Sequence, residues 1–370
     1  MVNRIAFFAL RLILVFFFVF LVSNSFAQMT AASNEQSPTI PSLIQSIRFE
    51  KPITYCNINI PLEDQQVKEM LEKEVLLALW DRPQVILWLK RSARYFPHVE
   101  KILKEYYLPL DLKYVPLIES ALRPHASSSR GAVGFWQFLR STGKQYGLRI
   151  DSHVDERLNI FKSTHAACKY LKDLNKKFGS YLLALSAYNM GEYGLKSEIQ
   201  AQKNNDFFTL YLPLETQRYP FKMIAAKMIF ENQNAYGICL KPSDLYPKFT
   251  FDQVNFNSDF KLPIFLIAQA ANIPFKTIKD YNPELRGYFL DKGEITIRIP
   301  KGHAKGFKKS FNVHYKNWQK DYSNTIHIVQ NGESLIGISK KYRMSVSSLL
   351  KKNGLSIKGI IHPGDRLMVD

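Results

Sequence analysis

One glutamate in this sequence, Glu119, stands where a carboxyl group could do acid–base chemistry. It ends an apolar helical turn, and the predicted helix carries an apolar stripe beside it, formed by Leu112, Val115, Ile118 and Leu122. A carboxyl group held against apolar surface has its charged form disfavoured and its pKa raised. Glu119 could then stay protonated at neutral pH and act as a proton donor. The alternative is an ordinary surface glutamate at a helix end, which the helical context alone would favour.

A loop of small residues follows Glu119 and carries polar groups that a polymeric substrate could contact. Gly131 and Gly134 permit close approach to the backbone, because glycine has no side chain and adopts conformations that other residues avoid. Gln137 offers amide donors and an acceptor for the acetamido group of a sugar. These neighbours favour the catalytic interpretation of Glu119 over the surface interpretation.

Helices must position these residues, and the spacing of apolar side chains predicts where they lie. A helix is expected to begin with Ser163 or Thr164 as its N-cap and to stop at Gly179. Ser180 is expected to cap the next helix, which ends near Gly191. The unit from about Lys104 to Asn232 is therefore predicted to be nearly all helix.

The second half contains an internal repeat. A shift of 71 positions overlays Ile264 to Asn282 on Leu335 to Asn353 without a gap, so we expect two copies of one small unit. Each copy has the pattern of two short helices, and strands flank the helices of the second copy. The stretch between the copies is rich in lysine and has aromatic residues at helical spacing. We interpret it as an amphipathic helix packed on the first copy rather than as an aromatic platform for sugars or membrane.

The N-terminus has the pattern of a secretory signal. Arg4 precedes an apolar run from Leu12 to Val22, and small residues follow up to Ala27. An uncleaved membrane anchor is the alternative, but the run is shorter than the roughly 20 apolar residues that span a bilayer. The protein is therefore expected to be exported to the periplasm or cell envelope.

The cysteine spacing predicts no metal site, and no cofactor is expected. Cys56, Cys168 and Cys239 are far apart and lack the paired spacing of zinc ligands. Export would permit one disulfide bond, and buried free thiols are the alternative, so the disulfide state is left open.

The net charge is strongly basic. The formal charge is +18, and removal of Arg4 and Arg11 with the signal would leave +16. Such a surface favours a polyanionic partner. We find no nucleic-acid-binding motif, and an exported protein rarely meets nucleic acid, so we predict a cell-wall polymer as partner. Peripheral association with a membrane and the oligomeric state are left open.

Four motifs in order resemble one known family. After the Glu119-Ser120 pair, they read Gly134-Phe135-Trp136-Gln137-Phe138, Val154-Asp155-Glu156-Arg157, Ala187-Tyr188-Asn189-Met190-Gly191 and Glu215-Thr216-Gln217-Arg218-Tyr219. They resemble the lytic transglycosylases with a goose-lysozyme-like SLT domain and a C-terminal LysM module, of the murein transglycosylase D type. The resemblance implies a mainly α fold: a helical, goose-type lysozyme-like catalytic domain followed by small α+β LysM modules of βααβ order.

The predicted domains follow from these patterns. They are a signal peptide at 1–27, an N-terminal helical region at 28–103, a lysozyme-like transglycosylase domain at 104–232, a degenerate LysM-like repeat at 258–300, a basic amphipathic connector at 301–324, and a LysM domain at 325–370.

The resemblance also implies roles for individual residues. Glu119 matches the sole catalytic residue of the family. Predicted substrate-binding residues are Ser128, Gln137, Phe138, Tyr188, Asn189 and Tyr219. Fold support is the alternative role for Ser128 and Tyr219, and Asp155 with Arg157 is expected to form a structural ion pair.

The implied reaction is cleavage of the β-1,4 bond between N-acetylmuramic acid and N-acetylglucosamine in peptidoglycan glycan strands, without water, leaving 1,6-anhydro ends. A hydrolytic muramidase and a noncatalytic wall-binding protein are the alternatives.

The chain departs from the family pattern at Asn159, where aspartate is frequent, and at Arg140, where proline is usual. Both departures concern loop geometry.

The LysM module is predicted to contact glycan through Asn331, Gly332, Glu333, Ser334, Leu355 and Ile357.

Overall fold

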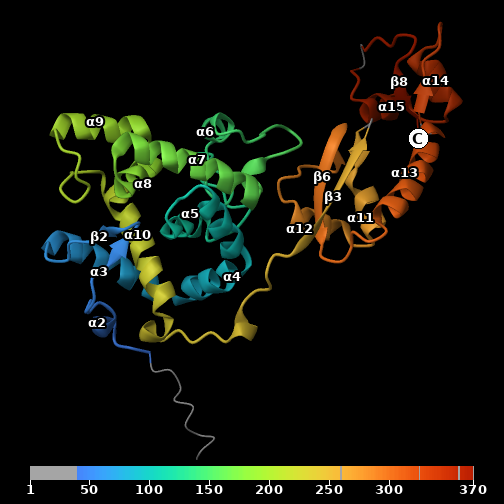
Figure 1. The fold of residues 1–370 in the computed structure, drawn as a ribbon. Helices are drawn as coiled ribbons and strands as arrows, with labels where there is room; N and C mark the ends of the chain where they lie inside the picture. Colours follow the sequence, from blue (N-terminus) through green and yellow to red (C-terminus); the bar gives the residue numbers. More distant parts are fainter. Residues whose placement is uncertain (1–39, 259–260, 325, 357–358, 370) are drawn as a thin grey trace, which may run out of the picture. The chain divides into compact units, whose positions relative to one another are not determined.

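The structure is a computed structural model that describes residues 40–258, 261–324, 326–356 and 359–369. The predicted signal peptide and Ile357 lie outside the described residues. The described chain forms two compact units (Figure 1). One combines residues 40–122 with 168–247, and the other combines 123–167 with the residues from 248 onward.

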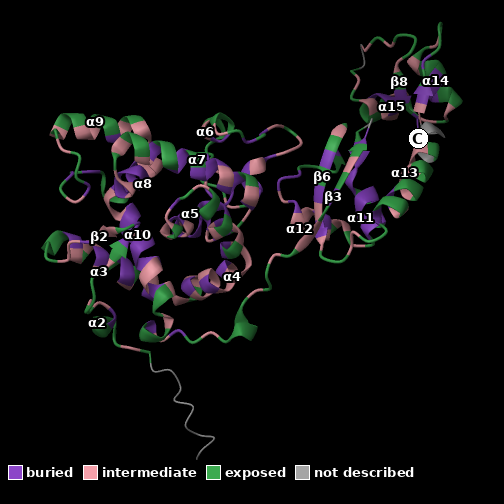
Figure 2. Ribbon diagram, in the orientation of Figure 1, coloured by how far each residue is buried: buried purple, intermediate pink, exposed green. Residues whose placement is uncertain are grey.

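The first unit is built almost entirely from helices. Its elements are α2 (Leu43–Ser46), β1 (Thr54–Tyr55), β2 (Ile58–Asn59), α3 (Gln65–Trp80), α4 (Arg82–Glu105), η1 (Leu110–Lys113), α5 (Tyr114–Ser120), α8 (Tyr181–Met190), α9 (Glu192–Gln202), α10 (Leu214–Glu231), η3 (Gln233–Tyr236) and η4 (Pro242–Asp244). Helix α10 packs against α3, α5 and α8. Six consecutive residues of α8 are buried, from Leu182 to Ala187 (Figure 2). The predicted mainly helical architecture is therefore confirmed.

Helix α7 (Ile160–Phe178) begins earlier than the sequence predicted. The Oδ1 atom of Asn159 accepts hydrogen bonds from the amides of Phe161 at 3.0 Å and Lys162 at 3.1 Å, so Asn159 caps the helix. The hydroxyls of Ser163 and Thr164 instead donate to carbonyl oxygens one turn back. The prediction of Ser163 or Thr164 as N-cap was wrong, because both residues already lie inside the helix. The predicted cap of α8 is confirmed, since Ser180 accepts from the amide of Leu182.

The second unit starts with the loop that follows Glu119 in sequence. The loop doubles back on itself, and bridges pair Ser127 with Val133 and Val133 with Phe138. Helix α6 (Arg140–Gln145) and the short helix η2 (Glu156–Leu158) follow before α7 begins.

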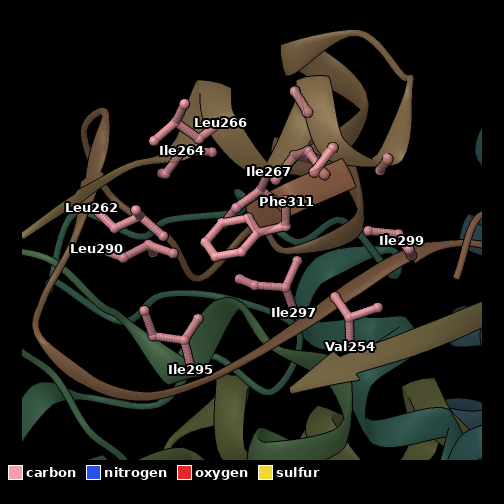
Figure 3. Close-up of a cluster of buried hydrophobic side chains, with 14 of the residues drawn as sticks. Val254, Leu262, Ile264, Leu266, Ile267, Leu290, Ile295, Ile297, Ile299 and Phe311 are labelled. Carbon is pink, nitrogen blue, oxygen red and sulfur yellow. The ribbon is translucent and has the colours of Figure 1, made fainter. Parts of the chain in front are cut away.

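A small α+β module comes next in the same unit. Its elements are β3 (Phe251–Ser258), β4 (Leu262–Pro263), α11 (Ile264–Ala271), α12 (Phe275–Tyr281), β5 (Phe289–Leu290) and β6 (Gly293–Pro300). Strands β3 and β6 pair antiparallel from Phe251–Pro300 to Ser258–Gly293. Helix α11 and strand β6 contribute to a core of aliphatic side chains that also contains Phe311 (Figure 3). The predicted boundary at 258 excluded β3, because only the helices of this copy are visible in the repeat.

The basic stretch after this module forms α13 (Phe307–Asn324). Phe307 and Phe311 are buried in the core of the module, and Tyr315 and Trp318 pack against it. The aromatic stripe thus faces a protein core, as the amphipathic interpretation predicted.

The C-terminal module has βααβ order. It consists of β7 (Ile326–Ile328), α14 (Leu335–Lys341), α15 (Val346–Asn353) and β8 (Arg366–Met368), with β7 and β8 antiparallel. Val329, Ile338, Leu349, Leu367 and Val369 form its core. Within the described residues, no helix is both long and apolar enough to cross a membrane.

Candidate active site

Glu119 lies in the last turn of α5, at a sharp change in backbone direction. The helix ends at Ser120, and the next two residues, Ala121 and Leu122, have φ angles of +50° and +56°. A left-handed conformation costs a non-glycine residue roughly 1–2 kcal/mol. Strain of this kind is concentrated at functional sites, where the surrounding structure holds it in place.

The environment of Glu119 keeps its carboxyl group ready to hold a proton. Burial raises its pKa from 4.5 to about 7, although the hydrogen bond from Tyr219 and the charge of Lys222 act to lower it and Glu215 to raise it. The hydroxyl of Tyr219 donates to Oε1 of Glu119. The rise in pKa agrees with the apolar stripe in the sequence. Near neutral pH, Glu119 can both give and take a proton.

Two tyrosines of the first unit accompany Glu119. The Tyr219 side chain is buried, and the ring of Tyr188 lies 5.3 Å from that of Tyr170. Burial and the charge of Glu119 raise the pKa values of Tyr188 and Tyr219 well above the usual range. Both phenols therefore stay neutral and keep their protons as hydrogen-bond donors.

Asn189 follows Tyr188 at the end of α8. Its Oδ1 atom accepts a hydrogen bond of 2.9 Å from the Thr216 hydroxyl on α10. This bond fixes the orientation of the amide in the same helical unit as Glu119. Asn189 is among the residues that the sequence predicts for the site. Thr216 is not, because it gives no signal beyond its place in the Glu215–Tyr219 motif.

An ion pair with a buried carboxylate links α10, the helix that carries Tyr219, to α3. Arg218 contacts Glu74 of α3, with 2.5 Å between Nε and Oε1, and Glu74 is buried. Sequence reasoning also missed this pair. Glu74 stands between Leu71 and Val75 on the apolar face of α3, and that position could have revealed it.

Ser128, Gln137 and Phe138 belong to the second unit, in the loop before α6. The Ser128 hydroxyl accepts from the amide of Ala132 at 3.1 Å. The Gln137 amide donates to the carbonyl oxygens of Ala126 at 3.0 Å and of Gly134 at 2.8 Å. Phe138 is buried, as a core side chain is. All three residues support the loop, and their contacts with a sugar stay predictions.

Asp155 and Arg157 form the structural ion pair that the sequence predicted. Their side chains are buried, with 2.8 Å between Nη2 and Oδ2. Burial would raise the pKa of Asp155, but Arg157 and Arg286 hold it below its usual value. Arg140, the other departure from the family pattern, donates to the carbonyl oxygen of Ile150 at 2.9 Å.

The predicted glycan-binding residues of the C-terminal module have mixed surroundings. Asn331 and Gly332 are exposed. Glu333 accepts from the amide of Gln330 at 2.7 Å, Ser334 caps α14, and Leu355 packs against the module core. Structural contacts thus engage three of the predicted residues, and glycan binding stays a prediction.

Titratable side chains elsewhere form no cluster suited to a metal ion in the described part of the chain. Cys56, Cys168 and Cys239 are free thiols, the first two of them buried.

Three family models match parts of the chain. The family model described as "Transglycosylase SLT domain" matches residues 99–210. The model "Lytic transglycosylase MltD, LysM-like domain" matches residues 251–316, and the model "LysM domain" matches residues 327–370.

Several known proteins are similar to parts of the chain. Membrane-bound lytic murein transglycosylase D of Escherichia coli K12 is 30% identical over 293 residues, covering 75% of this chain and 64% of that protein. The chain therefore spans slightly less than two thirds of this relative. Peptidoglycan transglycosylase gp16 of Escherichia phage T7 is 39% identical over 102 residues, covering 27% of this chain and 8% of gp16. Among solved structures, the 70 kDa soluble lytic transglycosylase of Escherichia coli has a TM-score of 0.34 and 16% identity, covering 47% of this chain and 32% of that one.

Proposed function

We propose that this protein is a peptidoglycan lytic transglycosylase, because residues 99–210 match the family model of the transglycosylase SLT domain and two LysM-type models match later residues. It would cleave the β-1,4 bond between N-acetylmuramic acid and N-acetylglucosamine and leave 1,6-anhydro ends. The observation that carries the proposal is the carboxyl group of Glu119, which has a pKa of about 7 and accepts a hydrogen bond from Tyr219.

The reaction needs one residue to act as acid and then as base. Protonated Glu119 gives its proton to the glycosidic oxygen as the bond from that oxygen to C1 of the muramyl residue breaks. The carboxylate then takes the proton of the muramyl C6 hydroxyl as its oxygen bonds to C1. Glu119 ends protonated as it began, and no water is consumed. Ordinary glycosidases, in contrast, use two carboxyl groups.

Tyr219 supports both halves of this cycle. Its hydroxyl donates to the carboxylate that forms after the first proton transfer, and charge-assisted hydrogen bonds are stronger than neutral ones. The bond also keeps the pKa of Glu119 from rising further, so that the carboxylate persists long enough to act as base.

We further propose that the LysM-type domains bind the wall polymer and that the protein works in the cell envelope. The similarity to a relative named as membrane-bound supports the location. A weak binding module tethered to a catalytic domain raises the local concentration of an insoluble substrate. The basic net charge of +18 suits a wall polymer that bears free carboxylates.

Mass spectrometry of digested peptidoglycan sacculi tests the reaction. Muropeptides with anhydro ends, one water lighter than hydrolytic products, are the expected result. Reducing muramic ends would instead identify a hydrolytic muramidase, and intact sacculi with bound protein would identify a noncatalytic wall-binding protein.

Tyr219→Phe tests the link between Tyr219 and Glu119. The substitution removes the hydrogen bond that lowers the pKa of Glu119, so that pKa should rise above about 7. Because the acid form starts the reaction, the alkaline limb of the pH–rate profile should move up by about one pH unit, the size expected for a charge-assisted hydrogen bond. Cleavage rates measured from pH 5 to 9 would show the shift.

Tyr193→Phe provides the matched control, because Tyr193 is exposed on α9. Its profile should overlay that of the unmodified protein. An alkaline limb of Tyr219→Phe that stays in place, or moves down, would contradict the role assigned to Tyr219.

A further inference from the structure

The LysM-like module that begins with β3 is joined by backbone hydrogen bonds to the SLT segment between α6 and α7. The amide of Asp155 donates to the carbonyl oxygen of Glu284 at 2.8 Å. The amide of Arg286 donates to the carbonyl oxygen of His153 at 2.7 Å. A bridge pairs Val154 with Leu285 between these two bonds. Residues 131 positions apart in sequence thus pair as neighbouring strands do.

A shared carboxylate strengthens this junction. Asp155 is 0% exposed, and its Oδ2 atom accepts from Nη2 of Arg157 at 2.8 Å and from Nη2 of Arg286 at 2.7 Å. Arg157 comes from the SLT segment and Arg286 from the module. A buried carboxylate held by two guanidinium groups loses much of its stabilisation when either partner is removed.

Arg157 continues the connection into the loop that carries Gln137. Its Nη1 atom donates to the carbonyl oxygens of Gly131 at 3.2 Å and of Phe138 at 3.0 Å. The two carbonyls lie at opposite ends of a tight loop in which Gln137 has a φ angle of +48°. A continuous chain of hydrogen bonds therefore connects Arg286, through Asp155 and Arg157, to these two carbonyl oxygens.

A second connection between the module and the SLT segment depends on Asn159, at a position where the family pattern often has aspartate. Its Nδ2 atom donates to Oε1 of Glu284 at 2.8 Å, while its Oδ1 atom caps α7. Glu284 is buried and also pairs with Arg298, at 2.5 Å. An aspartate at 159 could cap the helix, but it has no proton to donate. It would place a second carboxylate against Glu284.

We propose that this LysM-like module is a positioning element for the SLT domain, and that Asn159, Glu284 and Arg286 hold the loop around Gln137 in its working shape. The inference rests on the proposed function and on the predicted contact of Gln137 with the sugar. The module would then contribute to turnover itself, separately from any binding to the wall. None of the three residues is assigned a contact with substrate.

Asn159→Asp in the full chain tests the proposal. We expect kcat/KM on soluble glycan chains to fall about tenfold, since small displacements of positioning groups have effects of this order or larger. Most of the fall should appear as a rise in KM. The pH midpoint of the reaction should not move, because Glu119 is untouched. The matched control is Asn255→Asp at an exposed position of β3, where the Oδ1 atom accepts from Thr296 and an aspartate can do the same.

The double variant Asn159→Asp with Glu284→Gln separates positioning from general damage. The new amide at 284 can donate to the new carboxylate at 159, which removes the repulsion between two carboxylates and reverses the polarity of the hydrogen bond. Arg298 donates to the same Oε1 atom of Glu284 in the unmodified protein and would have to turn to the carboxylate at 159. We therefore expect partial recovery, with kcat/KM clearly above that of Asn159→Asp and below that of the unmodified protein. Recovery in the double variant would support the proposal, and a double variant as impaired as Asn159→Asp would overturn it.

Arg286→Ala gives an independent measurement, because the Arg286 side chain is 43% exposed and its loss should not prevent folding. We expect Arg286→Ala to raise KM and Arg286→Lys to raise it less.

If the unmodified protein is active and both Asn159→Asp and Arg286→Ala leave the kinetics unchanged, the inference is refuted while the proposed function stands. An inactive unmodified protein would instead refute the proposed function. Total bond cleavage is the readout, so anhydro and hydrolytic products count equally.

Discussion

Glu119→Gln is expected to lower the rate of glycan cleavage by about 10³-fold or more. General acid–base catalysis contributes roughly 10²–10⁴-fold, and in the proposed reaction one carboxyl group does both proton transfers. Glutamine keeps the size of the side chain and an oxygen that can accept from Tyr219, but it can neither donate an acidic proton nor take one. Release of muropeptides from sacculi measures the loss.

Glu231→Gln is the matched control for this substitution. Glu231 is exposed at the end of α10, so its neutralisation should leave cleavage unchanged. Binding of Glu119→Gln to sacculi should also persist, since the LysM-type domains are intact. Cleavage by Glu119→Gln at the rate of the unmodified protein would remove Glu119 from the mechanism.

The stability of Glu119→Gln gives a check on folding that is independent of activity. In the folded protein the pKa of Glu119 is about 7, above its ordinary value of 4.5. Between these values the folded state keeps a proton that the unfolded state has released, so stability falls as pH rises through this window. Above pH 7 the accumulated loss is about 3 kcal/mol. The glutamine variant lacks this loss and should gain stability relative to the unmodified protein between pH 4 and pH 8, measured by denaturant unfolding.

The features that the sequence predicted correctly are those set by local periodicity. The apolar stripe beside Glu119 predicted its raised pKa, which burial then produced. The aromatic spacing of the basic stretch predicted a packed helix, and Phe307 and Phe311 are in a core. In each case the signal lies within a few helical turns, where side chains three or four positions apart share one face.

The features that the sequence did not predict depend on contacts between distant segments. Nothing near Asn159 reveals that Glu284 lies against its amide, 125 positions away. The same holds for the contact between Asp155 and Arg286. For this reason the sequence alone shows Asn159 only as a departure in loop geometry. Strand β3 was missed for a related reason, since its partner β6 lies 35 or more residues further along the chain.

Gly134→Ala is expected to destabilise the protein strongly, because two effects coincide at this position. The φ angle of Gly134 is +86°, which costs a residue with a side chain roughly 1–2 kcal/mol. A Cβ atom there would also lie 1.9 Å from the carbonyl oxygen of Arg157 and 2.5 Å from its carbonyl carbon. Both are backbone atoms, which cannot move aside as the end of a flexible side chain can. A total loss of about 4 kcal/mol, near the upper end for single substitutions, is expected.

Gly131→Ala separates the two effects within the same loop. Gly131 has a similar φ angle, +80°, but a Cβ atom there would meet nothing within 4 Å. It should therefore lose only the roughly 1–2 kcal/mol of backbone strain. Equal losses in the two variants, measured by denaturant unfolding, would show that the contact of Gly134 with Arg157 is unimportant. A larger loss in Gly134→Ala, accompanied by slower cleavage, would show that the loop around Gln137 requires close packing on the segment that Arg157 and Asp155 fix.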